Sequence, residues 1–227
     1  MINLLLSDIE SFVRAKLDEV SPDSDFIATD NLDLAKIIEA AVVPVSRTVH
    51  LTAPNVLLDG EGLLTPPNIS VSDSVASFLL PSDFMRLVSV KMSGWMKSVN
   101  TVISEDSLEY RRQQNRYLRG TMRNPVAAVL HDTNGTMRME LYISKDTPVL
   151  EQFLYVPEIT VAYSNPPYIR ICPKLKTACL YAITAEVLRC FDQTQKAQMF
   201  DTLAQRQLNP THEQDRLHTA TGEKVIE

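Results

Sequence analysis

The chain has 227 residues, of which 44% are hydrophobic and 22% are charged, a composition typical of globular proteins that excludes disorder and collagen-like structure. Its 28 acidic residues outnumber its 22 lysines and arginines, so the formal net charge of -6 argues against attraction of the whole chain to nucleic acid or anionic lipid. The three cysteines, Cys172, Cys179 and Cys190, form no CxxC pair. They therefore indicate neither a disulfide framework nor a zinc knuckle, and they favour a reducing compartment.

Residues 1–52 predict two helices. Apolar residues recur at helical spacing from Leu4 to Leu17, with polar residues between them. Asp8 and Glu10 follow the apolar start at once, so we expect no signal peptide. No stretch reaches the about 18 to 20 apolar residues that span a membrane, and we expect a soluble protein. A second helix, capped by Asp30 or Asn31, carries its apolar face from residue 34 to 45.

The middle of the chain favours β-structure. Prolines and glycines exclude a long helix over 54–74, where we expect a loop or a short hairpin. The clearest hairpin signal joins 125–131 to 136–143 through Asp132-Thr133-Asn134-Gly135. Residues 104–107 supply an N-cap with acidic residues for a helix over 108–120 that is stopped by Gly120. Further strands are predicted over 75–80, 85–92, 99–103 and 151–163.

Two helices over 175–191 and 195–208, broken at Asp192-Gln193, follow the strands. The order of elements predicts an α+β fold in which a helical bundle, formed by the N- and C-terminal helices, packs beside a small, mainly antiparallel β-sheet or hairpin region. We expect a single domain over 1–208, with helices in 1–52 and 173–208, a β-rich middle in 75–165 and one inserted helix in 105–120. The polar segment 209–227 is expected to be an extended arm that contacts another chain.

The sequence offers no recognisable catalytic pattern. The four histidines, His50, His131, His212 and His218, are scattered without metal-binding spacing, and six glycines make no phosphate-binding loop. Ser82 and Ser93 lack a nucleophile elbow, and we interpret Cys179 and Cys190 as small buried hydrophobic residues and Trp95 as a core anchor. We therefore expect no enzyme, no catalytic residue, no cofactor and no metal.

One charged segment stands out. Five arginines and no acidic residue lie between 111 and 123, at Arg111, Arg112, Arg116, Arg119 and Arg123. If the helix over 108–120 forms, three of them share roughly one face, where guanidinium groups can meet carboxylates or phosphates. Three interpretations stay open: a solvated helix face, a contact with an acidic partner or neighbouring subunit, and a nucleic-acid surface. The acidic excess in residues 1–33 motivates the second interpretation.

Residues 78–90 read Phe-Leu-Leu-Pro-Ser-Asp-Phe-Met-Arg-Leu-Val-Ser-Val and are followed by Gly94-Trp95. Pro81 favours a turn, Asp83 can accept hydrogen bonds from nearby backbone N–H groups, and Phe84 re-enters the core. This segment resembles the "LPxDFxRLxxV…GW" segment of head-to-tail connector proteins of tailed bacteriophages, also called adaptor, neck or ring proteins. Residues 161–167, with their "VxYxxxP" pattern, and the "YxxxAxxLxxxxD"-like residues 181–192 are similar to later parts of the same family.

The resemblance covers residues 1–207 and implies a structural virion protein. Such a protein is expected to form a homo-oligomeric ring of about twelve copies between the portal and the tail. Its partners would be the portal protein and other neck and tail proteins, and double-stranded DNA would pass through the lumen without sequence-specific contact. The resemblance suggests a crAss-like gut phage as the source, with assembly in the host bacterial cytoplasm and no membrane contact. The alternative is a nucleic-acid-binding module that uses the basic helix 111–123.

Overall fold

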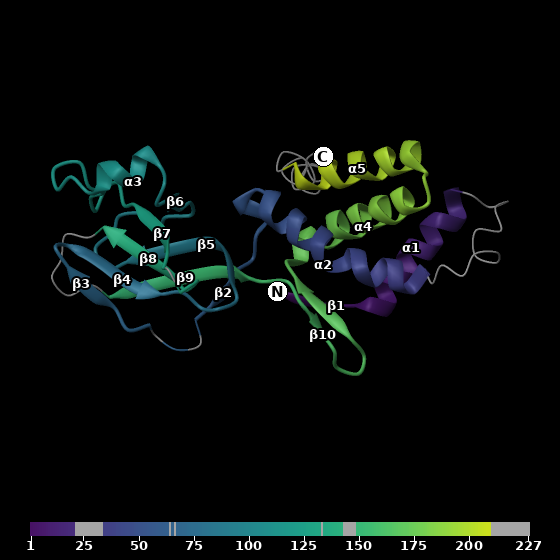
Figure 1. Ribbon diagram of the computed structural model, residues 1–227, viewed down its shortest axis with the longest axis horizontal. Coiled ribbons are helices and arrows are strands. Elements are labelled where there is room, and N and C mark those ends of the chain that lie inside the picture. The colour runs from purple at the N-terminus through teal and green to yellow at the C-terminus, as the bar shows by residue number, and fades with distance from the viewer. Residues whose placement is uncertain (21–33, 64, 66, 133, 143–148, 210–227) are drawn as a thin grey trace, which may run out of the picture. The chain divides into compact units, whose positions relative to one another are not determined.

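The computed structural model describes residues 1–20, 34–63, 65, 67–132, 134–142 and 149–209. These residues divide into two compact units (Figure 1). Unit 1 combines Met1–Leu58 with the chain from Ile159 onward, and unit 2 is the continuous segment Asp59–Glu158. The first and last parts of the chain therefore fold together, while the middle part forms a structure of its own.

Unit 1 contains most of the helical structure. Its helices are α1 (Leu6–Val20), α2 (Leu34–Thr52), α4 (Lys176–Cys190) and α5 (Thr194–Leu208), with short 3-10 helices at Asn55–Leu57 and Pro173–Leu175. The central helix α4 packs against α5, α2 and α1. Its apolar residues Ile183 and Val187 are fully buried, as are Val13 of α1 and Val42 of α2. The two C-terminal helices match their predicted positions closely, and Asp192, with a φ of 57°, forms the break between them.

A small antiparallel sheet completes unit 1. It has the order β1 (Ile2–Leu5), β11 (Tyr168–Ile171) and β10 (Val161–Ala162). Ile2 pairs with Ile171 and Leu4 pairs with Ile169, which joins the start of the chain to the residues before α4. Leu4, Ile169 and Ile171 are buried, so this sheet turns an apolar face into the core of unit 1.

Unit 2 is built from two sheets among its described residues. One has the order β2 (Glu61–Gly62), β9 (Leu150–Pro157) and β5 (Phe84–Met92), and all of its pairs are antiparallel. The other has the order β3 (Ser70–Ser72), β4 (Val75–Leu79), β8 (Met137–Tyr142), β7 (Ala127–His131) and β6 (Ile103–Ser104). In this second sheet only the β6–β7 pair is parallel.

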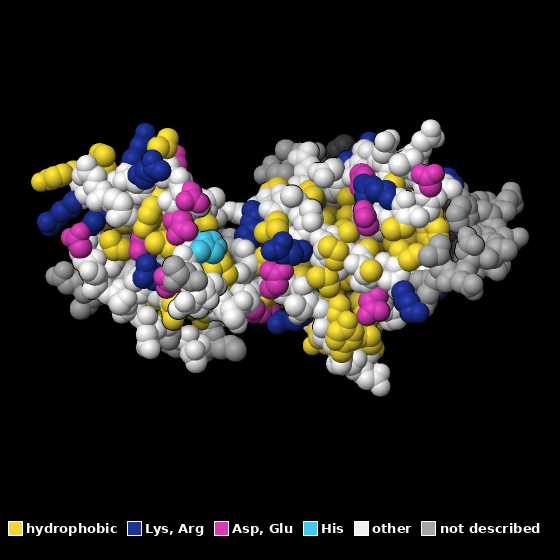
Figure 2. Space-filling model, viewed as in Figure 1, with side chains coloured by type: hydrophobic (Ala, Val, Ile, Leu, Met, Phe, Trp, Pro, Cys, Tyr) yellow, Lys and Arg dark blue, Asp and Glu magenta, His cyan; other side chains and the backbone are white. Residues whose placement is uncertain are grey.

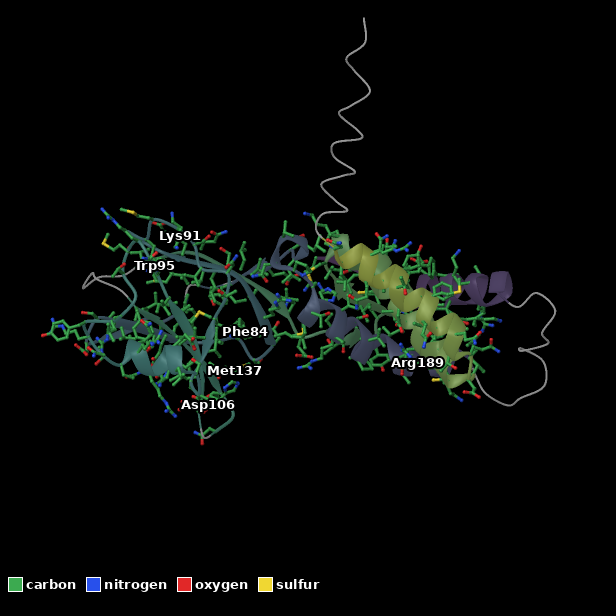
Figure 3. All side chains as sticks on the ribbon, turned by 90° about the horizontal axis from the view of Figure 1, so that it is seen from above. Phe84, Lys91, Trp95, Asp106, Met137 and Arg189 are labelled. Atoms are coloured by element: carbon green, nitrogen blue, oxygen red, sulfur yellow. The ribbon has the colours of Figure 1, made fainter. Side chains whose placement is uncertain are left out.

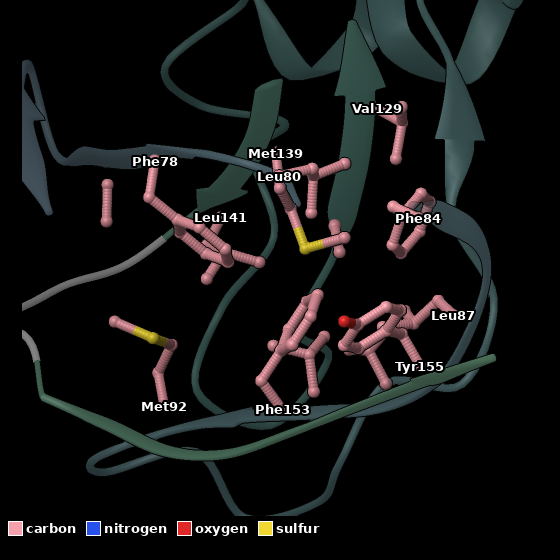
Figure 4. Packing of buried hydrophobic residues seen from close by; sticks show 14 of the residues in the cluster. Phe78, Leu80, Phe84, Leu87, Met92, Val129, Met139, Leu141, Phe153 and Tyr155 are labelled. Carbon is pink, nitrogen blue, oxygen red and sulfur yellow. The ribbon is translucent and has the colours of Figure 1, made fainter. Parts of the chain in front are cut away.

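Side chains from both sheets of unit 2 meet in one hydrophobic core (Figure 4). β4 and β8 contribute Phe78 and Met139, and β9 contributes Phe153, whose ring meets that of Phe78 edge to face at 5.5 Å between centroids. Buried residues alternate with more exposed ones along β4, as expected for a strand with one face in a core. Trp95, labelled in Figure 3, is 4% exposed and belongs to the same core.

The predicted hairpin at Asp132–Gly135 is confirmed. β7 and β8 pair from Ala127↔Leu141 to His131↔Met137. The backbone N–H groups of Asp132 and Gly135 donate to the carbonyls of Thr136 and Asp132, each over 2.9 Å, and Gly135 has a φ of 76°. A residue with a side chain would be strained at that φ, so the glycine fixes the turn.

The expected architecture of a helical bundle beside a small hairpin region was wrong. Among the described residues the protein is an α+β structure with five helices and three sheets, and it is rich in strands. Ile2–Leu5 is a strand where we expected the start of a helix, and Tyr168–Ile171 is a strand where we predicted no element. Ser70–Ser72 lies in the stretch 54–74, where we expected a loop or a short hairpin, and it pairs with β4 as a hairpin. Each of these short strands depends on pairing with another strand. Ile2–Leu5 and Tyr168–Ile171 pair with each other although they lie near opposite ends of the chain, and local periodicity does not indicate such a pairing. The predicted caps Asp30 and Asn31 and the arm after Asn209 lie outside the described residues.

Candidate functional site

The turn at residues 81–84 leads into β5 and joins it to β9. The backbone N–H of Phe84 donates to the carbonyl of Pro81 over 3.0 Å, which closes the turn. The carbonyl of Asp83 accepts from the N–H of Glu158 over 2.6 Å, and Phe84 pairs in register with Pro157. The turn therefore holds the start of β5 against the end of β9.

The side chains of this turn divide between core and surface. Phe84 is 8% exposed and stacks on Tyr155, with ring centroids 5.9 Å apart and an angle of 25° between the planes (Figure 4). The Tyr155 hydroxyl donates to Oδ1 of the exposed Asp83 over 3.1 Å. We had expected the Asp83 carboxylate to accept from the backbone, and the structure gives it a tyrosine hydroxyl. These contacts give Pro81, Asp83 and Phe84 a structural role.

The helix that carries the arginines is shorter than predicted. α3 spans Leu108–Gln113, and the Ser107 side chain caps it by accepting from the N–H of Tyr110. After the helix, the Asn115 side chain accepts from the N–H of Tyr117 over 3.1 Å, which favours a turn over continued helix. The side chain of Gln113 is buried, and its Oε1 accepts from the N–H of Gly120 over 2.7 Å. Residues 114–120 thus fold back onto the end of α3.

Arg119 holds this loop in place. Its Nε donates to the carbonyl of Gln113 over 2.9 Å, and its Nη2 forms an ion pair with Oδ2 of Asp73 over 2.8 Å. Asp73 and Ser74 have φ values of 47° and 62° in the turn between β3 and β4. The Arg119 side chain is only 14% exposed. It connects two loops within unit 2 and does not share an exposed face with Arg112 and Arg116.

The other four arginines are exposed. Arg111, Arg112, Arg116 and Arg123 form no ion pair with any other described residue. Tyr117, 94% exposed, and Leu118, 59% exposed, lie between them in sequence. We call these six residues the arginine surface, and Figure 2 shows lysine and arginine side chains gathered with apolar ones over the α3 region. Sequence reasoning missed Tyr117 and Leu118, although the Asn115 turn is a local signal that the helix ends before them.

The arginine surface carries side chains of the kind that bind other molecules. Guanidinium groups bind carboxylates or phosphates through two parallel N–H donors, and an exposed tyrosine adds a large apolar area with a polar end. Tyrosine and arginine are both enriched at the centres of interfaces between proteins. Stacking of bases on a tyrosine is the corresponding arrangement in proteins that bind single-stranded nucleic acid.

The remaining residues that carry chemistry have structural positions. Cys172 and Cys179 are buried, and burial raises the pKa of the Cys179 thiol to about 12, so this thiol stays protonated near neutral pH. Cys190 is exposed, so the prediction that it is buried was wrong. No group of three or more His, Cys, Asp or Glu residues in the described part of the chain is placed to hold a metal ion. In the same part of the chain, no helix has the length and apolar character needed to cross a membrane.

Comparison with known proteins does not assign the chain to a family. No protein-family model matches the chain, and the curated proteins include no sequence similar to it. The functional assignment therefore depends on the segment 78–95, on the order of the elements and on the surfaces described above.

Proposed function

We propose that this chain is a structural subunit of a ring between the portal and the tail of a phage, a head-to-tail connector through which DNA passes. The observation that carries the proposal is the Leu80-Pro81-Ser82-Asp83-Phe84 segment, followed by Gly94-Trp95. In the fold this segment forms a hydrogen-bonded turn that leads into β5 and joins it to β9. Phe84 packs in the core of unit 2. The packing of α1 and α2 on α4 supports the proposal. Helices from both ends of the chain combine, as the element order of the family implies.

In this ring the arginine surface contacts carboxylates of the adjacent subunit. Exposed Tyr117 and Leu118 favour a protein partner because apolar side chains gain from burial in a protein interface and gain little beside a DNA backbone. The chain as a whole is acidic, so a second copy can supply the carboxylates. A contact between unlike surfaces of neighbouring copies is heterologous, and such contacts close into rings when the rotation between copies fits.

Electron microscopy tests this function. Antibodies against the purified protein should label virions of the phage that encodes it at the junction between head and tail. Class averages of concentrated protein, alone or with the portal, should show rings of about twelve copies. Label elsewhere on the particle, or absence from the particle altogether, would contradict the proposal.

The alternative function is a nucleic-acid-binding module, which the four exposed arginines without described ion pairs favour. Such a module should bind DNA with an affinity that falls steeply with salt. Four phosphate contacts predict a slope of about -3.6 in a plot of log affinity against log salt for duplex DNA. A connector subunit should bind duplex DNA weakly, with a much shallower slope.

A further inference from the structure

A groove lies between three helices of unit 1. α4 packs against both α2 and α5 (Figure 1), and residues of all three helices line the groove. The groove has a volume of about 680 Å³. Side chains that line it include Ala40, Pro44 and Thr48 from α2, Ala182 from α4, and Ala204 and Leu208 from α5.

The groove is suited to an apolar segment of a protein. Its small and apolar lining presents no unmatched charge along most of its length. At one end Arg189, labelled in Figure 3, forms ion pairs with Glu186, over 2.7 Å, and with Asp201. Two carboxylates pair with this one guanidinium, so this end of the groove carries a net negative charge and offers no site for an anion. An apolar groove between helices is a common binding site for a short segment with spaced apolar side chains.

We infer that this groove binds residues 210–227 of a neighbouring copy of the chain. Leu208, the last residue of α5, lines the groove, and Asn209 is extended with φ -79° and ψ 115°. The described part of the chain therefore ends at the rim of the groove. The sequence of residues 210–227 places apolar residues among polar ones, at Leu217, Ala220, Val225 and Ile226. Fully extended, 18 residues reach roughly 60 Å, which is ample to reach an adjacent subunit.

A neighbouring copy is favoured because a ring needs two different surfaces on each subunit. In a head-to-tail ring, one surface of each copy fits a different surface of the next, and the groove and the segment after it supply such a pair. Exchange of a segment between copies also joins them without a large flat interface. This inference rests on the oligomeric part of the proposed function, and the experiments below separate the two.

Cross-linking identifies the copy whose segment fills the groove. Cys190 lines the groove and is exposed, while Cys172 and Cys179 are buried, so one native thiol is available there. In Ala220→Cys or Val225→Cys protein, mild oxidation should give covalent dimers and a ladder of higher species on non-reducing gels. The same variants with Cys190→Ser should give none. A disulfide within one chain, or no groove-dependent cross-link in either variant, would overturn the inference.

Two threonines provide a matched pair of substitutions. Thr48 and Thr202 are both exposed, and each hydroxyl donates over 2.9 Å to the carbonyl four residues earlier in its helix. Thr48 lines the groove and Thr202 does not. Thr48→Asp places a charge against the apolar segment and should weaken self-association by roughly tenfold or more, whereas Thr202→Asp should not. Equal effects of the two substitutions would contradict the inference.

Deletion of residues 210–227 separates this inference from the proposed function. The truncated chain should keep the thermal unfolding temperature of the monomer and lose self-association. If the truncated chain forms rings as the full chain does, the groove inference is wrong and the connector function stands. If the full chain cross-links between copies through Cys190 but is absent from the head–tail junction, the groove inference stands and the connector function is wrong.

Discussion

His50, near the end of α2, accepts a hydrogen bond from the backbone N–H of Cys172 at its Nε2 over 3.0 Å. Its Nδ1 lies 2.8 Å from the carbonyl oxygen of Ser46. Because a carbonyl can only accept, Nδ1 carries the proton and the imidazole is neutral. His50 is fully buried, and through it the first part of unit 1 holds the residues that lead into α4.

We expect His50→Leu to lower the free energy of unfolding by about 1 to 3 kcal/mol, because the buried N–H of Cys172 would lose its acceptor. His131→Leu is the control, since His131 is exposed at the end of β7. Urea unfolding followed by circular dichroism measures both. Equal stability of the two variants would show that the His50 hydrogen bonds contribute little.

Arg119→Ala should destabilise unit 2 by about 1 to 2 kcal/mol, since the largely covered Arg119 side chain donates to the carbonyl of Gln113 and pairs with the exposed Asp73 carboxylate. Arg116→Ala is the matched change at an exposed arginine and should alter stability by less than about 0.5 kcal/mol. Chemical unfolding followed by Trp95 fluorescence reports on unit 2, because Trp95 lies in its core. A larger effect from Arg116 than from Arg119 would contradict the assignment of these two arginines.

Arg116→Glu should impair ring assembly and leave the fold unchanged, because exposed charges contribute little to monomer stability. Adding Arg112→Glu should strengthen the effect. The control is Arg206→Glu, an exposed position on α5 outside the groove. Sedimentation and particle counts measure assembly. If assembly is unchanged and only DNA retention suffers, the arginine surface faces the lumen.

Only the Cys190 thiol should react rapidly with a thiol reagent in the folded protein at pH 8, and all three cysteines should react after unfolding. Cys190→Ser should abolish the rapid phase.

Because the folded pKa of Cys179 is raised from 9.0 to about 12, the unfolded chain releases this proton first as the pH rises. The contribution of Cys179 to stability is therefore complete below about pH 9 and is lost between about pH 9 and 12. A rapid reaction of Cys179 in the native state would contradict its burial.

Elements defined by neighbouring residues could be predicted from the sequence. The turn at Asp132–Gly135 and the helices around Asp192 are encoded locally, by residues that tolerate left-handed backbone and by apolar residues at regular spacing. Ile2–Leu5 could not be predicted as a strand because its apolar residues also continue the helical pattern of α1. Its partner lies near the other end of the chain, at Tyr168–Ile171.

Sequence reasoning singled out the five arginines between 111 and 123, but it predicted the wrong geometry for the segment that carries them. The arginine-rich composition located the surface, but the expected shared helix face required α3 to continue beyond Gln113. The contacts of Arg119 with Asp73 and of Gln113 with Gly120 decide the shape of the loop. The first of these contacts is between residues far apart in sequence, and no spacing rule reports it.

The insertion of unit 2 into unit 1 sets an order of events during synthesis. Residues 59–158 are continuous, and Glu61 pairs with Tyr155, so this unit has all of its strands as soon as β9 leaves the ribosome. α2 ends at Thr52 and α4 ends at Cys190, so at about 5 to 20 residues per second α2 is made roughly 7 to 28 s before α4 is complete. Throughout that time Ile38 and Val42, buried in the finished protein, lack their partner helix. We therefore expect the nascent chain to keep this apolar face of α2 uncovered by α4 after all strands of its middle unit have been made.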